Sequence, residues 1–201
     1  MAMLDIFEWG ANGDPIYGSG GGITWTSLDT AIISTAQAYQ GTRSMMLDAP
    51  GAVRPEAQFA LTATGAPAAY AIEFWLYKPD AAADIENVLQ HGNGTRRIYL
   101  RVDSSENVLY YDSDLPGYVD TGANVTADAW TEIKLQNINW ATYKWDIYVA
   151  GSLAKAGAGM VTSTIFANIV CFSGSTTNGE DIWIDNVIVK NWPPKPQIMI
   201  F

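Results

Sequence analysis

Along most of the chain, apolar and polar residues alternate with a period of two, which predicts β-strands that bury one face. The stretch from Tyr70 to Lys78 is the clearest case. One of its faces carries Ile72, Phe74 and Leu76, and the other carries Glu73, Trp75 and Tyr77. Arg96 to Asp103 repeats this alternation. The same criterion predicts strands at 108–112, 130–136, 143–149, 165–172 and 182–189.

Turn-forming residues separate these strands. Turns are expected at 18–22, 49–51, 65–67, 79–80, 92–94, 105–107 and 173–179. Residues 81–87 have the spacing of one helical turn, and no other stretch has the apolar spacing of a long helix. The pattern therefore predicts an all-β fold of roughly a dozen short strands, packed as a two-sheet antiparallel β-sandwich.

The two ends of this sandwich are expected to meet. A first strand is predicted at Leu4, and the last strand runs from Asp181 to Lys190. We expect these two strands to lie side by side in one domain, residues 1–192.

A proline-rich segment follows the domain and predicts an extended C-terminal tail, residues 193–201. Prolines stiffen the chain and cannot join a central strand. The apolar end of the tail would either fold back onto its own sandwich or insert into a neighbouring subunit. The second alternative makes a homo-oligomer the expected state. The residues expected to serve assembly are Pro193, Pro194, Pro196, Ile198, Ile200 and Phe201.

Composition narrows the range of functions. The net charge of −10 and the pI near 4.3 argue against nucleic acid, because phosphate binding needs clustered Lys and Arg. Eight Trp and ten Tyr favour sheet faces and binding surfaces. Cys171 is the one cysteine, so no internal disulfide forms, and its apolar neighbours predict a buried thiol. His91 is the one histidine and is expected in a surface loop. No apolar stretch approaches the ~20 residues of a membrane span.

Five short motifs follow one another along the chain. They are Phe7-Glu8, the turn at 38–44, a Trp-containing strand at 129–135, a hairpin at 145–151 and the closing strand at 182–189. In this order and spacing they resemble concanavalin A-like proteins, and more narrowly the laminin-G-like and carbohydrate-binding-module jelly rolls, over residues 4–190. In those families this hairpin more commonly ends in Val-Asp-Gly, whereas here it ends in Val-Ala-Gly. The resemblance implies a lectin-like fold whose ligands usually lie outside cells. Because no signal peptide precedes the first strand, we expect a virion surface or an extracellular location reached by another route.

The resemblance also implies a structural calcium ion. In related modules the Phe-Glu carboxylate, the turn with its Gly-x-x-Ser sequence and an Asp of the last strand surround the metal. Here these positions are Glu8, Thr42 and Asp185. Calcium takes several oxygen ligands in flexible geometry, which loops at a sheet edge can supply. Alternatively, Glu8 and Asp185 hydrogen-bond the turn amides without a metal.

Polar and aromatic residues are expected to gather on one outer sheet face. The residues of this predicted face are Glu73, Trp75, Tyr77, Arg97, Tyr99 and Arg101, with Asp146 and Tyr148 beside them. Aromatic planes stack on the CH faces of sugars, while charged groups bind their hydroxyls, so this mixture predicts glycan contact. Aromatic packing and cation–π stacking within the sheet are the alternative.

Catalytic signals are weak. A glycosidase needs two carboxylates about 5–10 Å apart across the scissile bond. The jelly-roll glucanases carry these as Glu-x-Asp-x-x-Glu, and none of the seven glutamates here has an acidic partner two residues further on. Alginate-lyase-like jelly rolls use Arg, His and Tyr on the sheet face, whereas His91 is predicted to lie in a loop. We therefore expect no enzymatic activity.

Together, these features predict a non-catalytic, lectin-like interaction or structural module. A virus or phage particle surface is the expected setting, with glycans or other viral structural subunits as partners. The first alternative is a carbohydrate-binding module of a secreted polysaccharide-degrading system. The second is a polysaccharide lyase or glycosidase with an atypical site.

Overall fold

The computed structural model describes residues 2–5, 7–15, 17–20, 23–27, 30–48, 55–60, 69–79, 85–93, 96–112, 114–115, 117–162, 167–174 and 181–191. The strands are β1 (Ala2–Asp5), β2 (Tyr17–Gly20), β3 (Ile23–Ser27), β4 (Ala31–Ser34), β5 (Ser44–Leu47), β6 (Glu56–Ala60), β7 (Ala69–Lys78), β8 (Ile85–Asn93), β9 (Arg96–Val102), β10 (Asn107–Asp112), β11 (Gly117–Asn124), β12 (Ala129–Asn139), β13 (Lys144–Val149), β14 (Ser152–Gly159), β15 (Val161–Thr162), β16 (Ala167–Ser173) and β17 (Ile182–Asn191). The described residues contain no helix, and hence none long and apolar enough to cross a membrane. The all-β prediction is confirmed.

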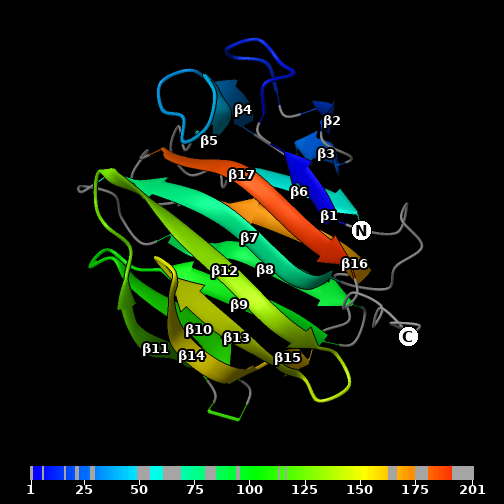
Figure 1. Cartoon of the computed structure of the whole chain (residues 1–201), viewed down its shortest axis with the longest axis vertical. Coiled ribbons are helices and arrows are strands. Elements are labelled where there is room, and N and C mark those ends of the chain that lie inside the picture. Colours follow the sequence, from blue (N-terminus) through cyan, green and yellow to red (C-terminus); the bar gives the residue numbers. More distant parts are fainter. Residues whose placement is uncertain are drawn as a thin grey trace, which may run out of the picture.

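The strands form two antiparallel sheets (Figure 1). Sheet A has eight strands in the order β14-β13-β12-β7-β17-β5-β4, with β1 paired to β17. Sheet B has nine strands in the order β11-β10-β9-β8-β16-β6-β3-β2, with β15 paired to β9. The two sheets enclose one hydrophobic core, so the predicted two-sheet sandwich is confirmed.

The first and last strands lie side by side, as the sequence predicts. β1 pairs with β17, with Ala2 opposite Lys190 and Asp5 opposite Val187. β17 also pairs with β7 and β5, which places it inside sheet A rather than at an edge. Figure 1 shows β17 between β1 and β7. The start and the end of the described chain are therefore joined by backbone hydrogen bonds.

The strand faces of β7 and β9 that were predicted to be apolar belong to the core. In β7, Phe74 and Leu76 are fully buried, and in β9 the same holds for Ile98 and Leu100. Full burial of a side chain of this size contributes about 1.5–3 kcal/mol. Because side chains of a strand alternate between its two faces, the polar residues of β7 and β9 point away from the core on opposite sides of the sandwich.

His91 is buried, so the prediction of a surface-loop histidine is wrong. β8 continues to Asn93, which places His91 inside a strand and on its core side. Its Nδ1 atom lies 3.0 Å from the carbonyl oxygen of Ile169, so Nδ1 carries the proton that the carbonyl accepts. Its ring meets Trp140 edge to face. Burial lowers the pKa of His91 to about 4. Cys171 is buried, as predicted.

Several boundaries differ from the sequence expectation. The glycine-rich run expected as a turn at 18–22 lies partly within β2, an edge strand of sheet B. Residues 85–87, expected in a helical turn, belong to β8, while 81–84 lie outside the described residues. The described residues form seventeen strands, more than the roughly dozen expected, and the additional strands are mostly short. The expected turns at 49–51 and 65–67 and the predicted tail, residues 193–201, lie outside the described residues.

One charged side chain continues the buried face of β7. Lys78 is fully buried, and its Nζ atom donates to Oε1 of Glu106 at 2.8 Å. Glu106 lies in the turn between β9 and β10 and has a left-handed backbone, with φ of 64°. This ion pair connects the end of a sheet A strand to a turn of sheet B.

Candidate functional site

The outer face of sheet A carries aromatic residues on adjacent strands. Trp130 of β12, Tyr77 of β7 and Trp183 of β17 form one row across the sheet, because Tyr77 pairs with both tryptophans. Tyr77 meets each of them edge to face, with ring centroids 5.7 Å from Trp130 and 5.6 Å from Trp183. All three rings are half-buried. Since neighbouring strands lie about 4.8 Å apart, the row extends over about 10 Å.

A further ring reaches this face from outside the sheet. Tyr39 belongs to the turn between β4 and β5, and it stacks on Trp75 with centroids 4.5 Å apart and ring planes 21° apart. It also lies 6.1 Å from Trp130. Tyr39 is 47% exposed, whereas Trp75 is half-buried beneath it. The ring that solvent and ligands reach first is therefore Tyr39. We call Tyr39, Trp75, Tyr77, Trp130 and Trp183 the aromatic face.

Asp185 of β17 holds the turn that carries Tyr39. Its Oδ2 atom accepts the backbone N–H groups of Tyr39 and Gln40, both at 2.9 Å. Asp185 is fully buried although it points outward from sheet A, because this turn covers it. Burial raises the pKa of Asp185 to about 6, with a smaller contribution from the charge of Glu8, while the backbone N–H donors act in the opposite direction.

Glu8 holds the other end of the same turn. Its Oε1 atom accepts the N–H groups of Thr42 at 2.6 Å and Arg43 at 2.8 Å, and its Oε2 atom accepts the Thr42 hydroxyl at 3.0 Å. Arg43 in turn donates to the Glu8 carbonyl oxygen at 2.9 Å. Partial burial acts to raise the pKa of Glu8, but these hydrogen bonds and the Arg43 charge outweigh it, so the pKa lies below its usual value.

The backbone around these two carboxylates is specialised. Phe7, before Glu8, has φ of 58°, and Asn186, after Asp185, has φ of 49°. Such left-handed conformations are costly for residues other than glycine and are retained where the surroundings fix them. Gly41 has φ of 74°, and a Cβ atom there would overlap the Glu8 carboxylate. Only glycine fits this point of the turn without displacement.

These residues test the calcium prediction. The turn directs amide N–H groups, rather than carbonyl oxygens, at both carboxylates. A calcium ion needs oxygen ligands, so this arrangement does not fit one without reorienting the turn. Among the described residues, no group of three or more His, Cys, Asp and Glu is placed to hold a metal. Calcium at Glu8, Thr42 and Asp185 stays a prediction.

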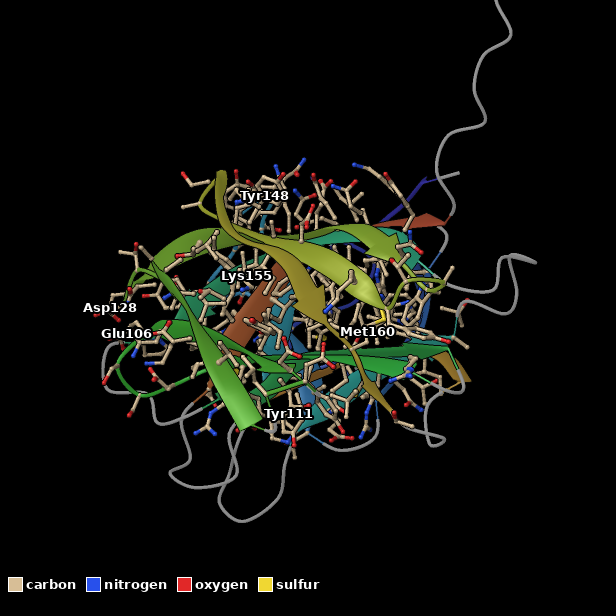
Figure 2. All side chains as sticks on the ribbon, turned by 90° about the horizontal axis from the view of Figure 1, so that it is seen from below. Glu106, Tyr111, Asp128, Tyr148, Lys155 and Met160 are labelled. Carbon is tan, nitrogen blue, oxygen red and sulfur yellow. The ribbon has the colours of Figure 1, made fainter. Side chains whose placement is uncertain are left out.

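The structure divides the polar-aromatic face that the sequence predicted as one surface. Glu73, Trp75, Tyr77, Asp146 and Tyr148 lie on sheet A, whereas Arg97, Tyr99 and Arg101 lie on β9 of sheet B. Figure 2 shows the two outer sides, with Tyr148 on one and Tyr111 of β10 on the other. The prediction of a single face is wrong because alternation tells inward from outward but not which sheet a strand joins.

Two of the other predicted sheet A residues, Glu73 and Asp146, have polar partners. Glu73 accepts a hydrogen bond from Lys190 Nζ at 2.6 Å. The Asp146 carboxylate accepts the Asn137 amide at 2.7 Å and the Gly157 backbone N–H at 2.8 Å. These contacts fix neighbouring strands to one another and place polar groups along one side of the aromatic face.

The sequence analysis missed three members of the aromatic face, Tyr39, Trp130 and Trp183. A signal for the two tryptophans existed, because each stands at an outward position of a predicted strand. Tyr39 lies in the turn at 38–44, which was identified as a motif, but no periodicity applies in a turn to predict where its ring points.

Sheet B presents a different surface. Arg97 stacks on the Tyr99 ring, with its guanidinium carbon 4.0 Å from the centroid. Arg101 lies 5.1 Å from the Tyr118 centroid. Tyr111 stands between the two tyrosines, 6.2 Å from Tyr99 and 5.5 Å from Tyr118. Arginine and tyrosine side chains gather on this face, whereas the sheet A face carries carboxylates and amines together.

No family model and no curated protein matches the chain. Several solved structures do match it. The botulinum neurotoxin serotype D binding domain aligns with a TM-score of 0.58 at 12% identity, over 94% of this chain and 47% of that chain. A carbohydrate esterase from the Shiga toxin-encoding bacteriophage phi24B aligns with 0.57 at 13% identity, over 83% and 90%. The endo-β-1,4-glucuronan lyase of the fungus Trichoderma reesei aligns with 0.58 at 12% identity, over 90% and 94%.

At such identities the likeness shows the fold alone, a two-sheet β-sandwich. The chain spans about half the length of the toxin binding domain. Membership of the concanavalin A-like family in particular stays a prediction.

Proposed function

We propose that this chain is a non-catalytic glycan-binding module whose aromatic face contacts sugar rings. The observation that carries the proposal is the Tyr39 ring, 47% exposed and stacked flat on Trp75 beside Trp130. Sugars present flat CH faces to aromatic planes, and each such contact contributes about 1 kcal/mol. A ring that is both accessible and supported from below is suited to this contact.

The layout of the face favours an extended ligand over a single sugar. The row of Trp130, Tyr77 and Trp183 crosses three strands and meets the stacked pair at Trp130. Polar groups for sugar hydroxyls stand two rows along the sheet from Tyr77, beyond Trp75, where Glu73 pairs with Lys134 across the strands. A chain of several sugars would contact aromatic and polar groups at once.

The state of the carboxylates supports a binding role without catalysis. Glu73 is ion-paired with Lys190 at 2.6 Å, and Glu132 with Lys134 at 3.0 Å. Glycoside hydrolysis needs two carboxyl groups free to act on one bond. Two solved structures with this fold are a carbohydrate esterase and a glucuronan lyase, so an assay for polysaccharide cleavage belongs beside the binding test.

A glycan array followed by titration of the best hits tests this function. Tyr39→Ala should weaken binding about fivefold, because one stacking contact of about 1 kcal/mol is lost. Tyr143→Ala is the matched control, since Tyr143 is 39% exposed but stacks with Arg96 away from the aromatic face. No glycan binding, or equal losses in both variants, would contradict the proposal. Release of new reducing ends from a polysaccharide panel would contradict the absence of catalysis.

The place of this module in a larger assembly stays a prediction. The expectation that it belongs to a virus or phage particle surface rests partly on the predicted tail at 193–201, which lies outside the described residues. The alternative, a carbohydrate-binding module of a secreted polysaccharide-degrading system, shares the same proposed binding face.

A further inference from the structure

A continuous row of apolar side chains crosses the outer face of sheet A and extends the aromatic face at one end. Trp183 of β17 pairs with Met46 of β5, and Met46 pairs with Ile32 of β4. Ile32 in turn pairs with Pro15 through an isolated bridge. Because directly opposed residues of neighbouring strands share a face, these side chains continue the row of three rings described above. We call Trp130, Tyr77, Trp183, Met46, Ile32 and Pro15 the apolar row.

The apolar row is accessible from outside the sandwich. Its residues are half-buried except for Pro15, which is exposed. The residues next to it along the strands point the other way, into the core, as Leu76, Ile184 and Leu47 show. The five strands β12, β7, β17, β5 and β4 lie about 4.8 Å apart, so they carry the row over about 19 Å. This length suits several sugar units of an extended chain.

The turn between β4 and β5 covers the polar positions beside the row. Ser44 Oγ donates to the Gln37 carbonyl oxygen at 2.6 Å. Ser34 Oγ accepts the Ala36 N–H at 3.1 Å. Together with Asp185, these serines are buried beneath the turn, whereas the apolar row next to them is not. A ligand on this part of sheet A therefore meets the apolar row first.

The two halves of the row differ in what they can contact. The aromatic half offers ring faces to sugar rings. In the other half, Met46 and Ile32 have neither a ring face nor a strong hydrogen-bonding group, and Trp183 Nε1 already donates to Ser34 Oγ at 3.2 Å. A sugar hydroxyl placed there would lose water without gaining a partner, whereas a methyl group would gain from burial. The aliphatic half therefore favours sugars that carry methyl groups.

The charges of this face favour a neutral ligand. The row itself has no charged member. Two lysines of the same face are held by carboxylates, since Lys134 pairs with Glu132 and Lys190 with Glu73. The net charge of −10 also repels acidic sugars.

We infer that the apolar row binds a neutral glycan with acetamido groups, whose sugar rings contact the aromatic half and whose acetamido methyl groups contact Met46 and Ile32. An acetamido group adds an apolar methyl to a sugar without adding charge, which is the combination that this row favours. The inference rests on the proposed function, because it names the class of glycan that the same face would select.

Isothermal titration with two oligomers of equal length tests the inference. One consists of β-1,4-linked N-acetylglucosamine and the other of β-1,4-linked glucose, so that they differ in the acetamido groups alone. The acetylated oligomer should bind at least about fourfold more tightly, which is the effect of burying one methyl group. Equal or tighter binding of the glucose oligomer, or binding of neither, would overturn the inference.

Matched variants locate the selectivity. Met46→Gln keeps the length of the side chain and Ile32→Thr keeps its branched shape, and each should weaken binding of the acetylated oligomer about fourfold. Binding of the glucose oligomer should not change, which also shows that the variants fold. Leu153→Gln is the control, because Leu153 is 53% exposed and pairs with Tyr148 at the far side of sheet A, outside the row. An equal loss in Leu153→Gln would overturn the inference.

A last variant separates this inference from the proposed function. Tyr39→Ala should weaken binding of both oligomers about fivefold, because both would stack on this ring. If the two oligomers bind equally and Tyr39→Ala weakens both, the proposed function stands and the inference falls. A glycan array without any hit would overturn both. Dimers in light scattering that Met46→Gln dissociates, without glycan binding, would assign the row to a second copy of the chain and likewise overturn the inference.

Discussion

Asp185 accepts the backbone N–H of Tyr39 at 2.9 Å, and so a buried carboxylate of the last strand positions the most exposed ring of the aromatic face. The same oxygen accepts the N–H of Gln40. The contact joins distant parts of the chain, since the two residues are 146 positions apart. It makes Asp185 a positioning residue for the proposed glycan contact.

Replacement of Asp185 should therefore affect both stability and binding. Asp185→Ala leaves two N–H groups of the turn without an acceptor, which should lower the free energy of unfolding by about 1–3 kcal/mol. The Tyr39 ring should lose its fixed position, and glycan affinity should fall with it. Asp185→Asn keeps one acceptor oxygen and should have the smaller effect in urea denaturation and titration. An Ala variant with full affinity would show that Tyr39 is placed without Asp185.

Opposite pH dependences are expected from two buried groups. Burial lowers the pKa of His91 from 6.5 to about 4, so the unfolded chain binds more protons in this window and stability falls as pH falls through it. Burial raises the pKa of Asp185 from 3.8 to about 6, so there the folded chain binds more protons and stability rises as pH falls. Each shift corresponds to about 3 kcal/mol, and the two nearly cancel between pH 6 and 4.

Urea denaturation of single variants between pH 4 and 7 separates the two groups. His91→Asn keeps a donor for the Ile169 carbonyl but does not titrate, so this variant should gain stability on acidification from pH 6 to 4. Asp185→Asn should lose stability over the same range. Variants that follow the wild-type curve in parallel would show that neither group is linked to folding in this way.

The same contacts lead to an expectation for metal removal. Because N–H groups occupy the oxygens of Glu8 and Asp185, a chelator should leave the Tm unchanged, and added calcium should not raise it. Differential scanning calorimetry with EDTA, with calcium and with magnesium as the control cation decides this. A lower Tm in EDTA that calcium but not magnesium restores would instead support the calcium site implied by the family resemblance.

Sequence reasoning recovered the fold but only part of the candidate site. The alternation in 70–78 and 96–103 identified the buried and outward residues of β7 and β9, because it depends on local geometry. The alternation did not show that Trp75 and Tyr99 lie on different sheets, because the sheet that a strand joins depends on its pairing with distant strands. His91 was misplaced because Gly92 and Gly94 suggest a turn, although the strand continues beyond it. Tyr39 was missed because its position depends on Asp185, a contact that no local pattern encodes.

The buried ion pair of Lys78 and Glu106 should matter more for stability than a surface pair. Lys78 is fully buried and the half-buried Glu106 is a carboxylate partner at 2.8 Å, so Glu106→Ala removes this counter-charge from a buried ammonium. Loss of one partner in such a pair costs about 3 kcal/mol or more. The double variant Lys78→Met with Glu106→Gln should recover much of this loss of stability, because an apolar chain suits the buried site.

Asp114→Ala is the control, since its pair with Lys144 is exposed and should contribute less than about 1 kcal/mol. Urea denaturation of all three variants measures the difference, and equal losses in Glu106→Ala and Asp114→Ala would show that burial of Lys78 adds nothing to the pair.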